Sequence, residues 1–154
     1  MMKLLFLDTE TTGVDTEKCA VIQVAGMIEY VKEPGVRGEV VKEFNFFMRP
    51  HPGAVIEPSA LAFHGIVESR VMGCERCHVE GYEDFMGLFG VLVNKFDKRD
   101  KMFFVGYNAR FDFDMLHALW GRLKDSYLGS WVWYPPLDVA VLAGQRLRWE
   151  RTRL

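Results

Sequence analysis

The sequence predicts a mixed α/β fold, and two observations predict it. Three apolar segments come first and are joined by short polar or Gly/Pro-rich turns, which favours an antiparallel meander of strands. Strand-like and helix-like segments then alternate, and strand–helix–strand units of this kind usually pair in parallel with right-handed crossovers. A chain of 154 residues fits one domain, so we expect a single domain over residues 1–154.

The first three strands are expected from apolar runs bounded by turn signals. The first covers residues 3–8 and is followed by the turn-rich segment TETTGVDTEK. The second covers residues 20–30, and the third, with partial alternation, covers residues 39–48. VKEPGVRG between the last two is the clearest turn signal. MRPHPG then ends the sheet pattern, so the meander is expected to have three strands.

Helices are expected where apolar residues recur three and four positions apart. Residues 58–64 look like a short helix. Residues 80–97 and 109–123 each carry a continuous apolar stripe at this spacing, which predicts two longer amphipathic helices. KMFFVGY, residues 101–107, separates them and predicts a fourth strand.

The end of the chain predicts one more strand and one more helix. WVWY, residues 131–134, is a short strand candidate, and the segment from Leu137 has a helical pattern before it turns basic. The sequence therefore predicts a five-stranded sheet in which three antiparallel strands precede the parallel ones.

Composition restricts the possible functions. The net charge is −2, from 19 basic and 21 acidic residues, so the chain as a whole does not attract phosphate, and contact with nucleic acid requires a local patch or a metal ion. No apolar run is long enough for a transmembrane helix, and the N-terminus does not resemble a signal peptide, so we expect a cytoplasmic protein without membrane contact. The cysteines Cys19, Cys74 and Cys77 are then expected to be reduced.

The segment FLDTETTG, residues 6–13, ends a buried-looking strand in two carboxylates. Side chains alternate along a strand, so Asp8 and Glu10 are expected on one face. Two partly buried carboxylates repel and need a cation, a shared proton or a basic partner, and no Lys or Arg lies in the segment. Their oxygens suit Mg²⁺ or Mn²⁺. The alternative is a solvated strand end that caps a turn.

A second acidic segment, GYNARFDFDML, covers residues 106–116. Asn108 lies between a strand and a helix and is a candidate N-cap. Asp112 follows in the first turn beside the apolar stripe, whereas Asp114 is about 200° further round the helix. The alternative for either aspartate is a first-turn acid that interacts with the helix dipole.

Together these segments give the sequence a family resemblance. FLDTETTG and NARFDFDML, with FHGI at residues 63–66 between them, resemble the DEDD family of 3′–5′ exonucleases, in particular its epsilon-like proofreading group. The resemblance runs from residue 3 to about residue 143. It implies a ribonuclease H-like fold, with helices flanking the five-stranded sheet.

The resemblance also implies a reaction and a site. Such enzymes hydrolyse the last phosphodiester at a single-stranded 3′ end of DNA or RNA, with two Mg²⁺ or Mn²⁺ ions about 3.5–4 Å apart. By position, Asp8 would bridge both ions, Glu10 would bind one of them and Asp112 the other. The residues expected to contact or position the substrate are Thr9, Thr11, Thr12, His64, Ile66, Asn108 and Phe111. For His64 and Ile66 a packed helix end is the alternative.

The sequence departs from the family at its end. The family has a fourth carboxylate in a last helix, preceded by a His or Tyr general base. No His follows His117 and no Tyr follows Tyr134, while Asp138 matches a different family position. Glu150, the last acid, lies in a basic tail. We therefore expect a C-terminally truncated exonuclease domain that is weakly active or inactive and exposes apolar surface suited to self-association. The alternative is a non-catalytic module that binds nucleic acid or a DNA polymerase.

Three other segments have competing interpretations. CERCH, residues 74–78, matches the c-type haem attachment pattern and could also supply zinc ligands, but ordinary loop residues are the expectation. WVWYPP, residues 131–136, could stack on bases, but core or interface residues are the expectation. The last segment could touch phosphates or be a solvated helix face; its arginines are Arg146, Arg148, Arg151 and Arg153.

Overall fold

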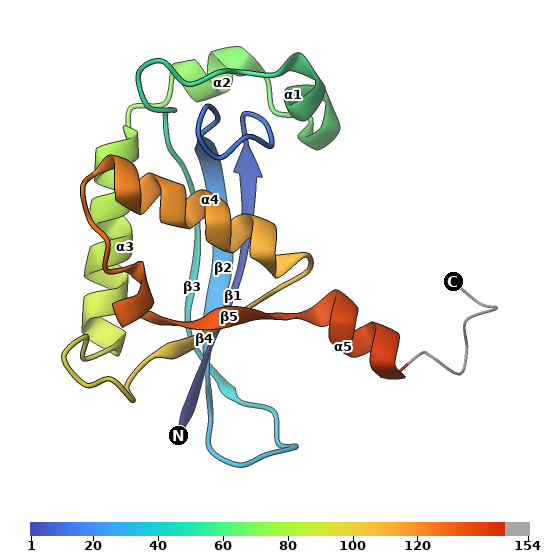
Figure 1. Ribbon diagram of the computed structural model, residues 1–154, viewed down its shortest axis with the longest axis vertical. Coiled ribbons are helices and arrows are strands. Elements are labelled where there is room, and N and C mark those ends of the chain that lie inside the picture. The colour runs from blue at the N-terminus through green and yellow to red at the C-terminus, as the bar shows by residue number, and fades with distance from the viewer. Residues whose placement is uncertain (147–154) are drawn as a thin grey trace.

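The computed structural model describes residues 1–146. A five-stranded sheet with the strand order β3-β2-β1-β4-β5 forms its centre (Figure 1). The strands are β1 (Met2–Thr11), β2 (Val21–Val31), β3 (Glu39–Phe47), β4 (Met102–Gly106) and β5 (Val132–Asp138). The helices are α1 (Pro58–His64), α2 (Glu68–Met72), α3 (His78–Leu92), α4 (Ala109–Arg122), the 3₁₀ turn η1 (Leu128–Ser130) and α5 (Val139–Arg146).

The sheet has the mixed topology that the sequence predicts. β1 pairs antiparallel with β2, and β2 pairs antiparallel with β3. β4 runs parallel to β1 on one side and to β5 on the other. The prediction of three antiparallel strands followed by parallel ones is therefore confirmed. None of the helices within residues 1–146 has the length and apolarity needed to cross a bilayer.

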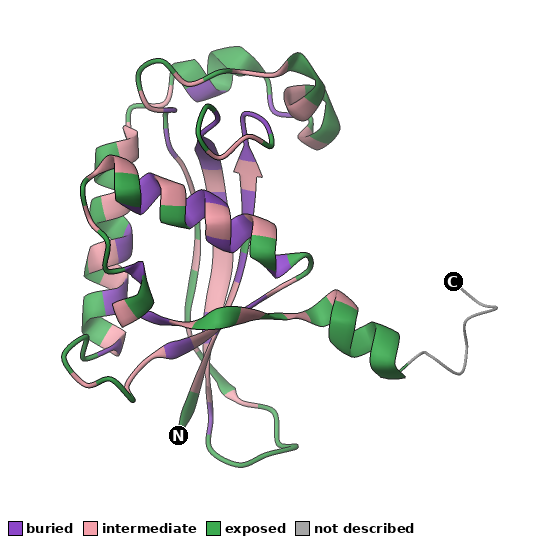
Figure 2. Ribbon diagram, in the orientation of Figure 1, coloured by how far each residue is buried: buried purple, intermediate pink, exposed green. Residues whose placement is uncertain are grey.

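The hydrophobic core lies between the sheet and the helices α3 and α4 (Figure 2). In β1, Leu5, Leu7 and Thr9 are buried toward this core, whereas Asp8 on the opposite face is exposed. Phe85 and Phe89 from α3 and Trp120 from α4 complete the core and are fully buried. Asp8 and Glu10 lie on the other face of the sheet, which α3 and α4 do not cover. α5 buries none of its residues, and Figure 2 shows most of it as exposed.

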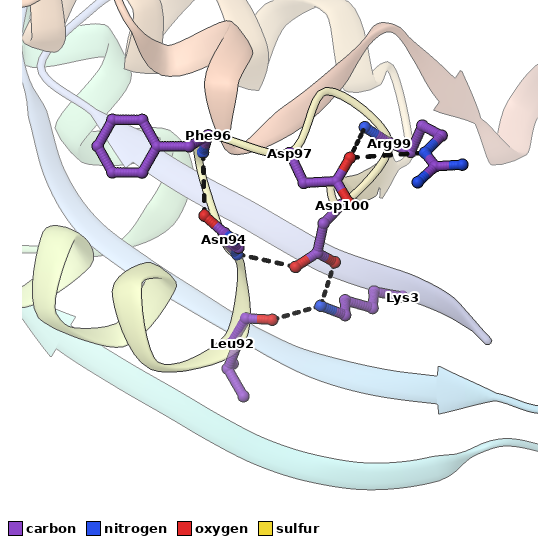
Figure 3. Close-up of polar contacts among 7 residues, drawn as sticks. All are labelled: Lys3, Leu92, Asn94, Phe96, Asp97, Arg99 and Asp100. Carbon is purple, nitrogen blue, oxygen red and sulfur yellow. Dashed lines mark hydrogen bonds and ion pairs between the residues drawn. The ribbon is translucent and has the colours of Figure 1, made fainter.

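The predicted helix over residues 80–97 begins earlier and ends earlier than expected. α3 ends at Leu92, although Phe96 continues the apolar spacing and is 85% exposed. The loop that follows is held by polar bonds instead (Figure 3): Lys3 pairs with Asp100 and donates to the carbonyl of Leu92, and the carboxylate of Asp100 accepts from the amide of Asn94. These bonds tie the loop to β1 and stop the helix.

The C-terminal elements also differ from the expected ranges. β5 extends to Asp138, so the helix predicted from Leu137 begins at Val139. Within WVWYPP, Trp131 and Val132 are buried, as expected for core residues, whereas Tyr134 is exposed and packs against Phe113 with ring centroids 5.2 Å apart.

Gly26 in β2 marks a place where two strands and a side chain approach closely. A Cβ atom there would lie 2.4 Å from the carbonyl oxygen of Phe6 and 2.7 Å from the ring of Phe44. We therefore expect Gly26→Ala to lower the free energy of unfolding by about 1–3 kcal/mol, measured by urea denaturation. Gly90→Ala is the matched control, because nothing lies within 4 Å of its added Cβ. It should be neutral or raise stability by up to about 1 kcal/mol; equal effects of both changes would contradict the prediction.

Candidate active site

A cavity of about 580 Å³ opens at the C-terminal end of β1, between α1 and the start of α4. Because β1 and β4 are parallel neighbours, their C-terminal ends meet at the same edge of the sheet, and the segment after β4 leads directly into α4. The site residues predicted from sequence that line this cavity are Asp8, Thr9, Glu10, Thr11, His64, Asn108, Phe111 and Asp112.

Two hydrogen bonds join the two acidic segments. The ladder between β1 and β4 ends at the pair of Phe6 and Val105, so β1 continues beyond its neighbour. Asp112, in the first turn of α4, lies beside this free part of β1. Its Oδ1 accepts from the Thr9 amide at 2.9 Å and from the Thr9 hydroxyl at 2.7 Å. Thr9 therefore holds the carboxylate of Asp112 in a fixed position.

The buried carboxylates of the cavity have perturbed acidities. Asp112 is 3% exposed, and burial raises its pKa from 3.8 to about 6; the bonds from Thr9 oppose this rise, and the nearby charge of Asp8 adds to it. Burial also raises the pKa of Glu10, with the ring of His64 lowering it and Asp8 raising it. Ionisation of Glu10 and Asp112 is therefore unfavourable without a positive partner.

The donor set suits a divalent cation in its chemistry, because carboxylate oxygens are the ligands that Mg²⁺ and Mn²⁺ prefer. Asp8 and Glu10 lie on one face of β1, and Asp112 lies across the same cavity. Within residues 1–146, however, no three His, Cys, Asp or Glu side chains are gathered as closely as a bound ion requires. Asp112 also uses one oxygen to accept both bonds from Thr9. The assignment of Asp8, Glu10 and Asp112 as metal ligands thus stays a prediction.

His64 is fastened to the end of β1. Its Nδ1 lies 3.3 Å from the amide of Ile66 and accepts that hydrogen. The other ring nitrogen, Nε2, donates to the carbonyl of Thr11 at 3.1 Å. The last residue of α1 is therefore positioned by the strand that carries Asp8 and Glu10.

Asn108 does not form the side-chain cap that its position predicts. Its backbone is left-handed, with φ of 53° and ψ of 40°, and its side chain makes no capping bond to α4. Asparagine is among the residues that tolerate this conformation. Its amide instead donates to Asp138 Oδ1 at 3.3 Å, and the same oxygen accepts from the amide of Ala140 at 2.8 Å. Asn108 thus links the cavity to the start of α5.

Two of the predicted substrate contacts lie elsewhere. Thr12 follows the end of β1 and is fully buried, with its hydroxyl accepting from the amide of Ala20 at 2.9 Å. Ile66 packs with Ile22 and Val71 in a second, smaller core. The side chains of Thr12 and Ile66 therefore stabilise the fold and do not line the cavity. Their assignment as substrate contacts stays a prediction, and for Ile66 the packing favours the alternative of a packed helix end.

The cavity also contains residues that were not predicted from sequence, among them Glu57, Phe63 and Tyr107. Phe63 and Tyr107 line it as aromatic residues that are 93% and 76% exposed. Glu57 supplies a further carboxylate; its amide donates to the carbonyl of Thr12, and its Oε1 accepts from the thiol of Cys19 at 3.7 Å. In the sequence Phe63 precedes His64 and Tyr107 precedes Asn108, so both lie beside predicted site residues, whereas Glu57 reaches the site through tertiary structure alone.

The other candidate motifs do not join this cavity. Cys77 is the N-cap of α3, and the thiol of Cys74 donates to the carbonyl of Phe47 at 3.5 Å. No zinc-type cluster forms around them within the described part of the chain. Arg146 is exposed at the end of α5. The remaining arginines of the tail, Arg148, Arg151 and Arg153, lie outside the described residues.

The chain matches a known protein family and has relatives among known proteins. The exonuclease family model RNase T matches residues 5–128. Ribonuclease T of Shewanella sp. strain W3-18-1 is 29% identical over 142 residues, which is 90% of this chain and 60% of the relative. Ribonuclease T of Shewanella baltica strain OS155 is 30% identical with the same coverage. The chain thus spans about 60% of the length of these relatives.

Solved structures show the same fold. E. coli Exonuclease I in complex with a dT13 oligonucleotide superposes with a TM-score of 0.73 at 20% identity, covering 97% of this chain and 31% of the other. Exonuclease I without ligand gives 0.71 at 19% identity, with 97% and 32% covered. The ribonuclease H-like fold is therefore confirmed, while the epsilon-like subgroup stays a prediction. Because the family model covers more than half of the chain, this protein belongs to the RNase T exonuclease family, within the DEDD superfamily of 3′–5′ exonucleases.

Proposed function

We propose that this protein removes nucleotides from the 3′ end of single-stranded nucleic acid by hydrolysis that requires a divalent cation. The observation that carries the proposal is the meeting of both acidic segments at one cavity, joined by the bonds from Thr9 to Asp112. The similarity to proteins named ribonuclease T supports an exonuclease, and the similar Exonuclease I structure holds a single-stranded oligonucleotide.

Each side chain then has a role in the proposed reaction. Asp8, Glu10 and Asp112 would hold Mg²⁺ or Mn²⁺, and two such ions, when bound, would activate water and offset charge on the phosphate. Thr9 orients Asp112 and shields it from water. The aromatic residues Phe63 and Tyr107 offer exposed faces on which bases could stack.

We expect only weak cleavage by the 154-residue chain. Its two acidic segments supply three of the four family carboxylates, and its sequence has no counterpart of the His or Tyr base at the family position. Glu57 adds a carboxylate to the cavity from a different part of the chain. Cleavage at a rate normal for such enzymes would contradict this part of the proposal and would make Glu57 the first residue to substitute.

The test uses a 5′-labelled single-stranded oligonucleotide with Mg²⁺, with Mn²⁺ or with a chelator. We expect a ladder that shortens from the 3′ end only when metal is present, and that disappears in Asp8→Asn. Asp114→Asn is the matched control, because Asp114 lies two residues from Asp112 but pairs with Arg110 at 2.6 Å. Binding of the oligonucleotide without cleavage in either metal would instead favour a non-catalytic module. Loss of cleavage in Asp114→Asn would contradict the assignment of the active-site residues.

The exposed ring of Phe63 gives a separate prediction. Phe63→Ala should weaken binding of a single-stranded oligonucleotide by about 5- to 150-fold, the loss expected when one base–aromatic stack of about 1–3 kcal/mol is removed. The melting temperature should not change, because the ring is 93% exposed. Phe96→Ala is the control: its ring is 85% exposed in the loop after α3 and lies outside the cavity. Equal binding by both variants, measured by fluorescence anisotropy, would contradict the prediction.

A further inference from the structure

The outer edge of β3 is an end of the sheet. In the strand order β3 has β2 as its single neighbour, and Figure 1 shows no strand beyond it among residues 1–146. An edge strand presents backbone donors and acceptors that another extended chain can pair with. What matters is which of these groups point outward and whether the surroundings leave room for a further strand.

The hydrogen bonds at the end of β3 identify the groups that point outward. The carbonyl of Phe47 accepts from Arg76 Nη1 at 3.3 Å and from the thiol of Cys74 at 3.5 Å, so it faces away from β2. The amide of the next residue, Met48, donates to Ile22 in β2. In an antiparallel strand the N–H and C=O of one residue face the same side, and the side alternates along the chain. Asn45 and Glu43 therefore also present both groups outward.

A groove of about 770 Å³ runs beside this edge, between β3 and α3. Phe44 and Phe46 from β3 and Leu88 from α3 line it with apolar surface. Val91 in the groove is 85% exposed, and nothing lies within 4 Å of a Cβ added at Gly87. A strand added to β3 would direct every second side chain toward α3, into this apolar groove.

The other side chains of an added strand would lie on the sheet face that carries Glu43. Glu43 and Asn45 point to the sheet face opposite the one that carries Phe44, because neighbouring side chains alternate. Opposite charges across a strand pair are favourable, so a Lys or Arg beside Glu43 is preferred. The groove itself carries charges of both signs: Asp84 is paired with Arg76 at 2.7 Å, and Lys42 and Glu83 also line it.

We propose that the outer edge of β3 binds an extended peptide segment of a partner protein by β-strand addition, with apolar residues toward α3 alternating with basic residues beside Glu43. Main-chain bonds to Glu43 and Asn45 would supply affinity, and the apolar groove together with the carboxylate of Glu43 would supply selectivity. A second copy of β3 fits less well, because pairing about Glu43 would set two Glu43 carboxylates against each other.

The test uses a fluorescein-labelled peptide of alternating Val and Lys and the same peptide with Glu in place of Lys. We expect saturable binding of the Val/Lys peptide, weaker binding of the Val/Glu peptide, and NMR shifts at the amides of Glu43, Asn45 and Gly87. Asn45→Pro should weaken binding by at least about tenfold, because it removes an outward N–H. Proline is tolerated there, since that N–H makes no bond to β2.

Matched variants make the test specific. Both Asn45 variants lose the side-chain bond from Gln23 Nε2 to Asn45 Oδ1 (2.9 Å). Asn45→Ala keeps the backbone N–H of residue 45, so it should bind the Val/Lys peptide as tightly as wild type. Gly87→Phe should fill the groove and block binding, whereas Gly90→Phe, exposed on the same helix but outside the groove, should not. Cleavage should be equal in all four variants, which separates this test from that of the nuclease.

Three outcomes would overturn the proposal. The first is no binding of the Val/Lys peptide to a wild-type protein that is folded. The second is equal binding by Asn45→Pro and Asn45→Ala. The third is a dimer, detected by sedimentation, that Asn45→Pro dissociates, because the edge would then serve a second copy of this chain.

Discussion

Asp112→Asn should strongly reduce cleavage and at the same time stabilise the folded protein at neutral pH. The carboxylate of Asp112 is 3% exposed, and its pKa is raised to about 6 mainly by burial. At neutral pH the folded protein therefore keeps an ionised group in a poorly solvated position. Asparagine removes the charge, and its Oδ1 can still accept both bonds from Thr9.

The pH dependence follows from the direction of the shift. The folded state binds the proton of Asp112 more tightly than the unfolded state, whose pKa is near 3.8, so stability falls as pH rises from about 4 to about 6. Above this window the full cost applies, at most about 3 kcal/mol for a shift of this size. For a chain of this length that corresponds to roughly 5–10 °C in melting temperature. Below about pH 4 the variant should lose its advantage.

The measurement is thermal unfolding of wild type and Asp112→Asn from pH 4 to pH 8 in chelator, together with the nuclease assay in Mg²⁺. Cleavage should fall by about 100- to 1,000-fold, as when one preorganised electrostatic group is removed from a site. Asp114→Asn should show neither effect, since Asp114 is partly exposed and paired with Arg110. A lower melting temperature for Asp112→Asn at pH 8 would show that the charged form is stabilised by its surroundings.

The fold could be predicted from sequence where the local apolar pattern and the tertiary packing favour the same secondary structure. The apolar stripes of residues 80–97 and 109–123 pack against the sheet as α3 and α4. α2 was not predicted, because it has five residues and buries only Val71, which leaves no periodicity to detect. The end of α3 was overestimated, because the bonds of Lys3 and Asp100 that fix the following loop join segments far apart in the chain.

In the site, too, the residues marked by local sequence could be predicted, whereas those placed by tertiary contacts could not. Asp8, Glu10 and Asp112 lie in segments whose local sequence marks the end of a strand and the start of a helix, so their meeting at one edge of the sheet could be expected. Thr12 could not be assigned in this way, because its hydroxyl is taken by Ala20 across a turn. Glu57 lies in the cavity only because its segment packs on the loop that follows β1.

Phe85→Ala should be among the most destabilising truncations in the core. Phe85 is fully buried on α3, and its ring lies 6.2 Å from Phe44, 5.3 Å from Phe46, 5.5 Å from Phe89 and 5.4 Å from Trp120. Truncating a buried phenylalanine costs about 3–5 kcal/mol, from lost transfer energy and the cavity left behind. Four aromatic rings line the space that the truncation would leave.

Urea denaturation measures the loss of unfolding free energy in Phe85→Ala. Phe96→Ala is the control, because the ring of Phe96 is 85% exposed; this change should alter the free energy of unfolding by no more than about 0.5 kcal/mol. Phe85→Leu should recover part of the loss by refilling the cavity. The ring of Phe85 connects the edge strand β3 to α4, whose first turn carries Asp112. A cost below about 1 kcal/mol for Phe85→Ala would mean that α3 packs loosely on the sheet, and the groove beside β3 would then lack the rigid wall that strand addition requires.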